Sequence, residues 1–209
     1  MIPAPRDYSF IAPLYDHVFN IPLSEGHREI GSLIKTLSKK PGMKILEVGV
    51  GSGLTLNHVP NNQAFTGVDS NERMLSFASA KASKLKRKKI TLMKMDAHKL
   101  EFKASSFDLV LAPSVITALK SPEKGMQEMV RVTKKGGHIA VIANLRVKNS
   151  FRSGMVRLVD PITRKFLGYR TDMDIETFAA FKGLKLVERK QINSVMGMHL
   201  SWFLLFKKM

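Results

Sequence analysis

The sequence predicts an α/β protein in which a mostly parallel β-sheet is covered by helices on both faces. Two observations lead to this prediction. From residue 43 onward, short β-like runs alternate with helix-like segments, and a glycine-rich turn directly follows the first of these runs. The chain has 209 residues, 44% of them apolar, which is enough to bury one sizeable core. A single domain over residues 1–209 is therefore expected, with N-terminal helices in residues 1–40 and the sheet in residues 41–209.

Seven strands are predicted, each of them a short run of mainly apolar or β-branched residues. In order, the predicted strands are Lys44–Val48, Ala64–Val68, Ile90–Met95, Phe107–Leu111, Gly137–Ala143, Leu184–Lys190 and Leu200–Phe206.

Helices are predicted from apolar spacing and from start and stop signals. The segment Asn71–Lys86 repeats its apolar residues at helical spacing. Another helix begins at Ser121-Pro122-Glu123, with serine as the cap and proline in the first turn, and ends before Gly136-Gly137. Before the first strand, Asp7–Ser38 predicts two helices broken around Asn20-Ile21-Pro22, and these are expected to pack over the sheet edge or its ligand.

The charge is the unusual feature of the composition. Lysine and arginine number 34 against 17 aspartate and glutamate residues, so the formal net charge is +17. A field of this sign concentrates the protein on polyanions, and both nucleic acid and anionic lipid qualify. The run Lys81–Lys89 is interpreted as a solvated helix end and turn.

Composition also excludes several kinds of site. The chain has no cysteine, which rules out disulfides and thiolate metal sites. The six histidines are scattered without the spacing of metal ligands, so no metal is expected. The N-terminal segment does not resemble a signal peptide, and no run of about 18 apolar residues occurs. The cytoplasm is the expected location.

The stretch ILEVGVGSGL at residues 45–54 joins a buried strand to a glycine-rich turn. Glycine at positions 49, 51 and 53 lets the backbone pass close to a ligand. The spacing differs from the GxGxxG pattern that binds a pyrophosphate, and it favours a ligand with adenosine but no phosphates. Glu47, at the end of the strand, is placed to orient the loop or to meet a cationic group of the ligand.

Acidic residues end the next two predicted strands. Asp69 lies 20 residues after Gly49, where its side chain can accept hydrogen bonds from ribose hydroxyls. Asp96, within Met95-Asp96-Ala97, can accept a hydrogen bond from an adenine amino group while the backbone of its neighbour reads the ring. The two acids therefore extend the predicted adenosine site across neighbouring strands.

These motifs, with Ser106–Leu111 and Gly136–Ile139, resemble those of the class I S-adenosylmethionine-dependent methyltransferases. The resemblance covers most of residues 41–143. It implies a Rossmann-like, seven-stranded sheet in which only the last strand is antiparallel. It also implies S-adenosyl-L-methionine as cofactor, S-adenosyl-L-homocysteine as product and no metal, with the sulfonium near Gly49–Gly51 and residues 112–114. The cofactor-binding residues implied are Tyr15, Glu47, Gly49, Gly51, Gly53, Asp69, Ser70, Met74, Met95, Asp96, Ala97 and Ala112.

Segments outside this core resemble the small bacterial phospholipid N-methyltransferases, which convert phosphatidylethanolamine stepwise towards phosphatidylcholine. The resemblance lies in Tyr8–Asp16, in Gly26-His27-Arg28 and in Val59-Pro60. It implies methyl transfer to the amino headgroup of phosphatidylethanolamine and its methylated derivatives. Tyr8 and Tyr15 are then candidate catalytic residues, because an aromatic face stabilises a methylammonium.

Residues 149–170 interleave basic and apolar side chains. Such a segment either lies in a lipid interface, with its cations on headgroup phosphates, or forms a lid helix packed on the domain. The expected partners are an anionic membrane surface and a phospholipid, and the expected location is cytoplasmic, peripherally associated with the inner face of the membrane. The residues assigned to substrate or membrane contact are Arg152, Arg157, Arg164, Lys165 and Arg170.

Other functions compete with this interpretation. A methyltransferase for another small or membrane-borne acceptor, such as a quinone, shares Tyr15-Asp16 and the glycine loop. An RNA methyltransferase would suit the charge, but the chain has no appended nucleic-acid module and no aromatic residue within Lys81–Lys89, so nucleic acid is the less favoured partner. A catalytically silent cofactor-binding subunit is disfavoured by the intact loop, Asp69 and Asp96. The sequence carries no signal of oligomeric state.

Overall fold

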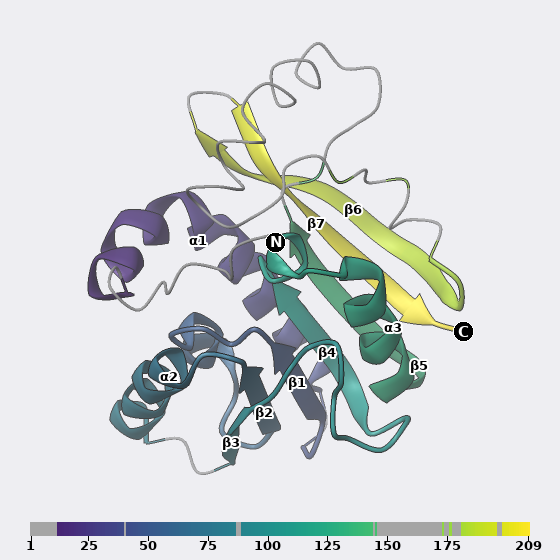
Figure 1. The fold of residues 1–209 in the computed structure, drawn as a ribbon, viewed down its shortest axis with the longest axis horizontal. Helices are drawn as coiled ribbons and strands as arrows, with labels where there is room; N and C mark the ends of the chain where they lie inside the picture. The colour runs from purple at the N-terminus through teal and green to yellow at the C-terminus, as the bar shows by residue number, and fades with distance from the viewer. Residues whose placement is uncertain are drawn as a thin grey trace.

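A computed structural model of the chain describes residues 12–39, 41–86, 89–143, 145, 173, 176, 181–195 and 198–209; for residues 12–24, 193–195 and 198–200 it describes the backbone alone. These residues form one seven-stranded sheet with helices packed against it (Figure 1). The α/β architecture predicted from the sequence is confirmed.

The sheet has the strand order β3-β2-β1-β4-β5-β7-β6. β7 is antiparallel to both of its neighbours, β5 and β6, and the other neighbouring pairs are parallel. This confirms a mostly parallel sheet whose last strand in the chain is antiparallel. The strands are β1 (Lys44–Val48), β2 (Ala64–Asp69), β3 (Ile90–Lys94), β4 (Phe107–Pro113), β5 (Thr133–Ala143), β6 (Leu184–Val195) and β7 (Met198–Lys208).

Different helices cover the two faces of the sheet (Figure 1). The helices α1 (Ala12–Leu37) and α2 (Glu72–Lys84) pack on one face, and α3 (Pro122–Val132) packs on the other. Successive residues of β4 serve the two cores, since Leu109 belongs to the cluster under α1 and Val110 to the cluster under α3. Burial on both faces is the usual condition of parallel strands. Two short 3-10 helices follow β1 and β4: η2 (Leu54–His58) and η3 (Ile116–Ala118).

The N-terminal prediction was wrong about a helix break. Two helices separated around Asn20-Ile21-Pro22 were expected, whereas α1 continues from Ala12 to Leu37. A proline inside a helix removes one hydrogen bond and crowds the preceding turn, but this bends a long helix more readily than it ends it. Ile30 and Ile34 of α1 are fully buried, and their packing stabilises the helix independently of the proline.

The fifth strand begins earlier than predicted. Gly136-Gly137 was expected to separate α3 from the strand, but β5 starts directly at Thr133 and contains both glycines. The register between β4 and β5 shifts between Phe107 and Leu109. Glycine is required at this irregularity, because a Cβ on Gly137 would lie 2.9 Å from the carbonyl oxygen of Asp108. The pair therefore marks a bulge and not a helix stop.

Two smaller predictions need similar adjustment. Ser121 is the N-cap residue of α3, as predicted, but its side chain makes no capping hydrogen bond. Both strands of the β6–β7 hairpin are longer than predicted, and they pair from Leu184 with Lys208 to Val195 with Met198.

Candidate functional site

The carboxyl ends of neighbouring strands bring the predicted ligand-binding residues to one edge of the sheet. Glu47 of β1 is in register with Gly67 of β2 and Leu111 of β4, and Asp69 of β2 is in register with Lys94 of β3. The segments that follow these strands therefore leave the sheet close together. This edge contains the switch point between β1 and β4, which is where open α/β sheets bind ligands.

The loop after β1 needs glycine for its backbone conformation. Gly49, Gly51 and Gly53 have φ angles of +73°, +53° and +79°, in a region that other residues rarely adopt. The N–H groups of Gly49 and Val50 both donate to the carbonyl oxygen of Val68, at 2.8 and 3.0 Å. The loop is thus attached to β2 before it turns away from the sheet.

The space around each glycine shows which of them packs against the protein and which is open to a ligand. A Cβ on Gly49 would lie 2.5 Å from Cγ2 of Val115, and a Cβ on Gly53 would lie 2.8 Å from Cδ1 of Leu56. These two glycines let the loop pack closely against the protein. A Cβ on Gly51 would meet no atom within 4 Å. Gly51 therefore borders open space, as expected of a residue over which a ligand lies.

Asp69 joins the glycine loop to the start of α2. Its Oδ2 accepts a hydrogen bond from the N–H of Gly51, and its Oδ1 accepts one from the N–H of Asn71, both at 2.9 Å. Asn71 caps α2 by accepting from the N–H groups of Arg73 and Met74, at 3.0 and 3.2 Å. A carboxylate oxygen can accept more than one bond, so Asp69 still has acceptor capacity for ribose hydroxyls.

Glu47 is a buried acid with one oxygen unpaired. The residue is 2% exposed; its Oε1 accepts a hydrogen bond from the Thr55 hydroxyl at 3.1 Å, and its Oε2 has no hydrogen-bond partner. Burial raises the pKa of Glu47 to about 8, the Thr55 hydrogen bond opposes this rise, and the charge of Asp69 adds to it. The side chain is therefore mostly protonated at pH 7. A cationic ligand group beside it would favour the carboxylate and give Oε2 a partner.

Asp96 and His98 connect the end of β3 to the start of α3. Oδ1 of Asp96 accepts from the N–H of His98 at 2.9 Å and lies 2.6 Å from His98 Nδ1, and His98 Nε2 accepts from the N–H of Ser121 at 3.2 Å. A backbone N–H only donates, so Nε2 carries no proton and Nδ1 donates to Asp96. The backbone N–H of His98, more than any other group, holds the pKa of Asp96 below its ordinary value. The ionised side chain is 66% exposed and can also accept a bond from a ligand.

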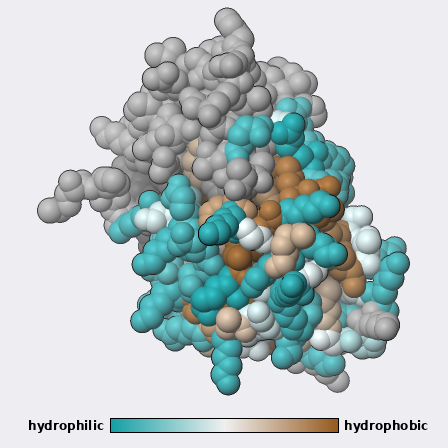
Figure 2. All heavy atoms as spheres, turned by 90° about the vertical axis from the view of Figure 1, so that its right-hand side faces the viewer, coloured by the Kyte–Doolittle hydropathy of each residue, from teal (hydrophilic) through white to brown (hydrophobic). Residues whose placement is uncertain are grey.

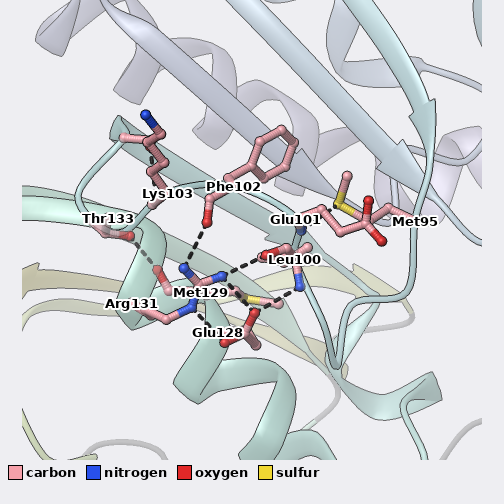
Figure 3. A network of polar contacts seen from close by, with 10 residues as sticks. Met95, Leu100, Glu101, Phe102, Lys103, Glu128, Met129, Arg131 and Thr133 are labelled. Carbon is pink, nitrogen blue, oxygen red and sulfur yellow. Dashed lines mark hydrogen bonds and ion pairs between the residues drawn. The ribbon is translucent and has the colours of Figure 1, made fainter.

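Arg131, near the end of α3, anchors the segment that follows this pair (Figure 3). Its guanidinium donates to the carbonyl oxygens of Leu100 and Phe102 at 2.6 and 2.7 Å. It also donates to both carboxylate oxygens of Glu128, at 2.7 and 2.8 Å. Glu128 in turn accepts the N–H of Leu100 at 2.8 Å. This network fixes the connection between β3 and β4 a few residues beyond Asp96.

The loop after β4 lies against the glycine loop, and β4 itself includes Ala112 and Pro113, which were expected in that loop. The link is Val115, which occupies the space that a Cβ on Gly49 would need. Ser114 has φ +60°, and its N–H donates to the carbonyl oxygen of Ile142 at 2.8 Å. Several predicted cofactor-binding residues in these segments have buried side chains, so a ligand would meet their backbone: Met74, Met95, Ala97 and Ala112.

The structure thus brings the glycine loop, Glu47, Asp69 and Asp96 to one edge, with Ser70 exposed beside Asp69. Tyr15 lies on α1, but its side chain lies outside the described part of the chain. Outside the described residues altogether lie Tyr8, Arg152, Arg157, Arg164, Lys165 and Arg170. Within the described residues, no group of three or more His, Asp or Glu side chains is arranged as a metal site.

Sequence reasoning missed four residues that shape this edge. His98 could have been found from its position two residues after Asp96, and Asn71 from its place just before a predicted helix. Thr55 and Val115 carry no such signal, because each contacts the site only through the tertiary fold.

Comparisons with known proteins agree with this geometry. Residues 46–141 match the sequence family described as "Methyltransferase domain". A phosphatidylethanolamine N-methyltransferase from Cereibacter sphaeroides is 33% identical over 154 residues, which are 71% of this chain and 73% of that protein. A demethylmenaquinone methyltransferase from Renibacterium salmoninarum is 32% identical over 133 residues, which are 63% of this chain and 54% of that protein. This chain therefore spans about half the length of that quinone methyltransferase.

A solved structure shows the same fold. The magnesium protoporphyrin IX methyltransferase from Synechocystis PCC 6803, which holds S-adenosylhomocysteine, superimposes with a TM-score of 0.68 over 88% of this chain and 82% of that one, at 15% identity. The residues here fit such a ligand, since Gly51 borders open space, Asp69 and Asp96 offer acceptors, and Glu47 has an unpaired oxygen. The chain belongs to the class I S-adenosylmethionine-dependent methyltransferases, and S-adenosylmethionine is its cofactor.

Proposed function

We propose that this protein transfers methyl groups from S-adenosylmethionine to the amino headgroup of phosphatidylethanolamine and its methylated derivatives, at a membrane surface. The observation that carries the proposal is the 33% identity with the Cereibacter sphaeroides phosphatidylethanolamine N-methyltransferase. That similarity covers 154 residues, whereas the methyltransferase family match covers residues 46–141 alone. It is therefore longer than the match to the methyltransferase family, and it includes residues outside that match.

When bound, the cofactor supplies a methyl group that the amine nitrogen displaces from sulfur, so that an N–C bond replaces an S–C bond and the positive charge passes to nitrogen. The chain contributes mainly by alignment. Asp69 accepts the N–H of Gly51 and so fixes the loop that would hold the cofactor, and Glu47 at the start of that loop is buried away from solvent. Tyr8 and Tyr15 are proposed to face the methylammonium, because aromatic faces stabilise such cations.

The proposed membrane contact is electrostatic and peripheral. Its supports are the net charge of +17 and the basic, amphipathic sequence of residues 149–170. Among the described residues, no helix is both long and apolar enough to cross a bilayer. Sedimentation with vesicles that contain phosphatidylglycerol should exceed sedimentation with neutral vesicles and weaken as salt rises. Equal binding to both vesicle types would contradict the electrostatic contact.

A second candidate acceptor is a quinone ring carbon. It is favoured by the 32% identity with the Renibacterium salmoninarum demethylmenaquinone methyltransferase. The two candidates share the cofactor site and differ in the atom that receives the methyl group, so the chemical position of the transferred methyl separates them.

The decisive experiment supplies methyl-labelled S-adenosylmethionine with three acceptors in separate reactions: vesicles of phosphatidylethanolamine, vesicles that carry demethylmenaquinone, and transfer RNA. The expected result is label in the lipid headgroup, with mass spectrometry placing the added methyl on nitrogen. Label in the quinone alone would replace the first candidate by the second, and label in RNA alone would end both.

A matched pair of glycine variants controls for loss of folding. Gly51→Ala adds a methyl group beside the cofactor site, and Gly42→Ala adds one at the turn before β1, where φ is +85° and no atom lies within 4 Å. Both changes strain a left-handed residue, but only the first borders the site. Activity should fall in Gly51→Ala and persist in Gly42→Ala.

A further inference from the structure

Much of the positive charge is gathered at the edge of the sheet opposite to the cofactor loop. A set of lysines lies on the segments that enter the amino-terminal ends of the parallel strands or leave the antiparallel β7. We call this set the lysine edge. Its members are Lys39, Lys44, Lys84, Lys86, Lys89, Lys103, Lys134, Lys135, Lys182, Lys185, Lys207 and Lys208.

Strand direction places these residues together. Lys44 begins β1, Lys89 precedes β3, and Lys134 lies in the first residues of β5. Because β7 is antiparallel to β5, its last residues, Lys207 and Lys208, reach the same edge, near the C-terminus marked in Figure 1. Seven strands spaced about 4.8 Å apart make this edge about 29 Å wide. The five residues of β1 separate it from the glycine loop by about 17 Å.

The lysine edge has almost no acidic side chains to balance it. Among the described residues of segments 38–44, 84–90, 103–108, 133–136, 182–185 and 207–209, Asp108 is the sole aspartate or glutamate. Its Oδ1 accepts from Nζ of Lys134 at 2.6 Å, and its Oδ2 accepts from the backbone N–H of Lys44 at 2.9 Å. Most of the other lysines are exposed. Figure 2 shows hydrophilic side chains, in teal, along the bottom of the face that it presents, on the side of the lysine edge.

Repulsion within the edge is built into the strand register. Lys185 of β6 and Lys207 of β7 are direct cross-strand partners, and Lys207 is also paired with His138 of β5. Like charges placed directly opposite destabilise a sheet. Lys185 and Lys207 line a shallow groove together with Lys135 and Lys208. Lys207 also lowers the pKa of His138, although burial of the ring contributes more. An anion in this groove would relieve the repulsion.

We propose that the lysine edge binds the sugar–phosphate backbone of a nucleic acid, on the side of the molecule opposite to the cofactor site. Lysine ammonium groups contact phosphates without reading bases. The described residues of the edge expose no aromatic ring for base stacking, so the contact is independent of sequence. This surface goes beyond the proposed function, because a nucleic acid held there is docked away from the methyl-transfer site.

The geometry favours a nucleic acid over a lipid surface. A bilayer docked on the lysine edge would face away from the cofactor loop, so a lipid acceptor in that bilayer would lie at the wrong end of the sheet. The described segments of the edge expose one large apolar side chain, that of Met209, and it offers little area for insertion into lipid.

The test compares two triple variants that remove the same charge from different edges. One is K135Q/K185Q/K207Q on the lysine edge; the other is K99Q/K120Q/K124Q, from exposed residues near the start of α3 and the loop after β3. The probe is a fluorescein-labelled DNA duplex of mixed sequence, and binding is measured by fluorescence anisotropy over a range of salt concentrations. Thermal melting checks that both variants remain folded, as expected for exposed side chains.

The lysine-edge variant should bind the duplex on the order of 100-fold more weakly than wild type at 0.1 M salt. The slope of log affinity against log salt concentration should fall by the amount that corresponds to the loss of about 2 to 3 phosphate contacts. The control variant should bind within a few-fold of wild type. An equal loss of duplex affinity in both variants would mean that binding depends on net charge alone, and this would overturn the proposal. So would a lysine-edge variant that loses binding only to phosphatidylglycerol vesicles.

Cofactor binding supplies an independent readout. The two sites lie at opposite edges, so saturating duplex should leave the calorimetric affinity for S-adenosylhomocysteine unchanged. Competition between duplex and S-adenosylhomocysteine would place the nucleic acid at the cofactor edge and overturn the assignment. Because no methyl acceptor is involved, this result does not depend on which acceptor the enzyme uses.

Discussion

Replacing Glu47 by glutamine should stabilise the cofactor-free protein at neutral and alkaline pH. Burial raises the pKa of Glu47 from 4.5 to about 8. The folded protein therefore holds this proton more tightly than the unfolded chain, so the free energy of unfolding falls as the pH rises from 4.5 to 8. At about 1.4 kcal/mol per pH unit, this loss is about 3 kcal/mol at pH 7 and on the order of 5 kcal/mol above pH 8. Glutamine has no proton to lose and keeps an acceptor for Thr55.

Urea unfolding of wild type and Glu47→Gln at pH 5 and pH 8 measures this effect. The two proteins should differ little at pH 5, and the variant should be more stable by on the order of 5 kcal/mol at pH 8. Thr55→Val is the matched control, because it removes the hydrogen bond that lowers the Glu47 pKa. The Glu47 pKa should therefore rise further, and the free energy of unfolding should keep falling to a higher pH than in wild type. If the free energy of unfolding changed equally between pH 5 and pH 8 in wild type and in Glu47→Gln, the reasoning would be refuted.

The same ionisation should appear in cofactor binding. If the cationic amino group of the cofactor meets the Glu47 carboxylate, binding requires that the proton leave. The affinity of wild type for S-adenosylhomocysteine should then rise by up to about tenfold per pH unit between pH 6 and 8. The Glu47→Gln variant should bind more weakly and lose this dependence. Calorimetry at several pH values measures the affinity and its dependence on pH. If the variant kept the pH dependence of wild type, Glu47 would not be the group that contacts the ligand.

Three further substitutions test the rest of the site. Gly51→Ala should weaken S-adenosylhomocysteine binding at least about tenfold while lowering stability by about 1 kcal/mol, and an equal loss of affinity in Gly42→Ala would contradict the placement of the cofactor. His98→Ala removes the imidazole contact but keeps the backbone N–H that contributes most to the low pKa of Asp96, so NMR titration should show that pKa rising only part of the way towards its ordinary value; an unmoved titration would mean that the imidazole does not contact Asp96. Arg131→Gln leaves two backbone carbonyls without their donor and should lower the free energy of unfolding by about 2 to 4 kcal/mol, whereas a loss well under 1 kcal/mol in urea titrations would show that water replaces the guanidinium.

The cofactor could be predicted from the sequence because its binding motifs are local. The strand, glycine loop and acidic residue that build such a site each follow from short-range properties, namely apolar patterning, the freedom of glycine at positive φ, and the position of Asp69 at a strand end. Parallel strands then bring their carboxyl ends together without further information. The prediction failed at Gly136-Gly137 and at Pro22. Glycine and proline occur both at the ends of helices and strands and at irregularities within them, so the residue type alone did not distinguish the two cases.

The sequence alone therefore determined the fold class and the cofactor, and it predicted the residues proposed to hold that cofactor. The tertiary structure decided that burial raises the pKa of Glu47, that Gly51 rather than Gly49 borders open space, and that lysines from six separate segments form one surface. Burial, close approach and charge repulsion depend on distances between residues far apart in the chain. Periodicity and motif spacing do not encode those distances, so they emerge only when the sheet is assembled.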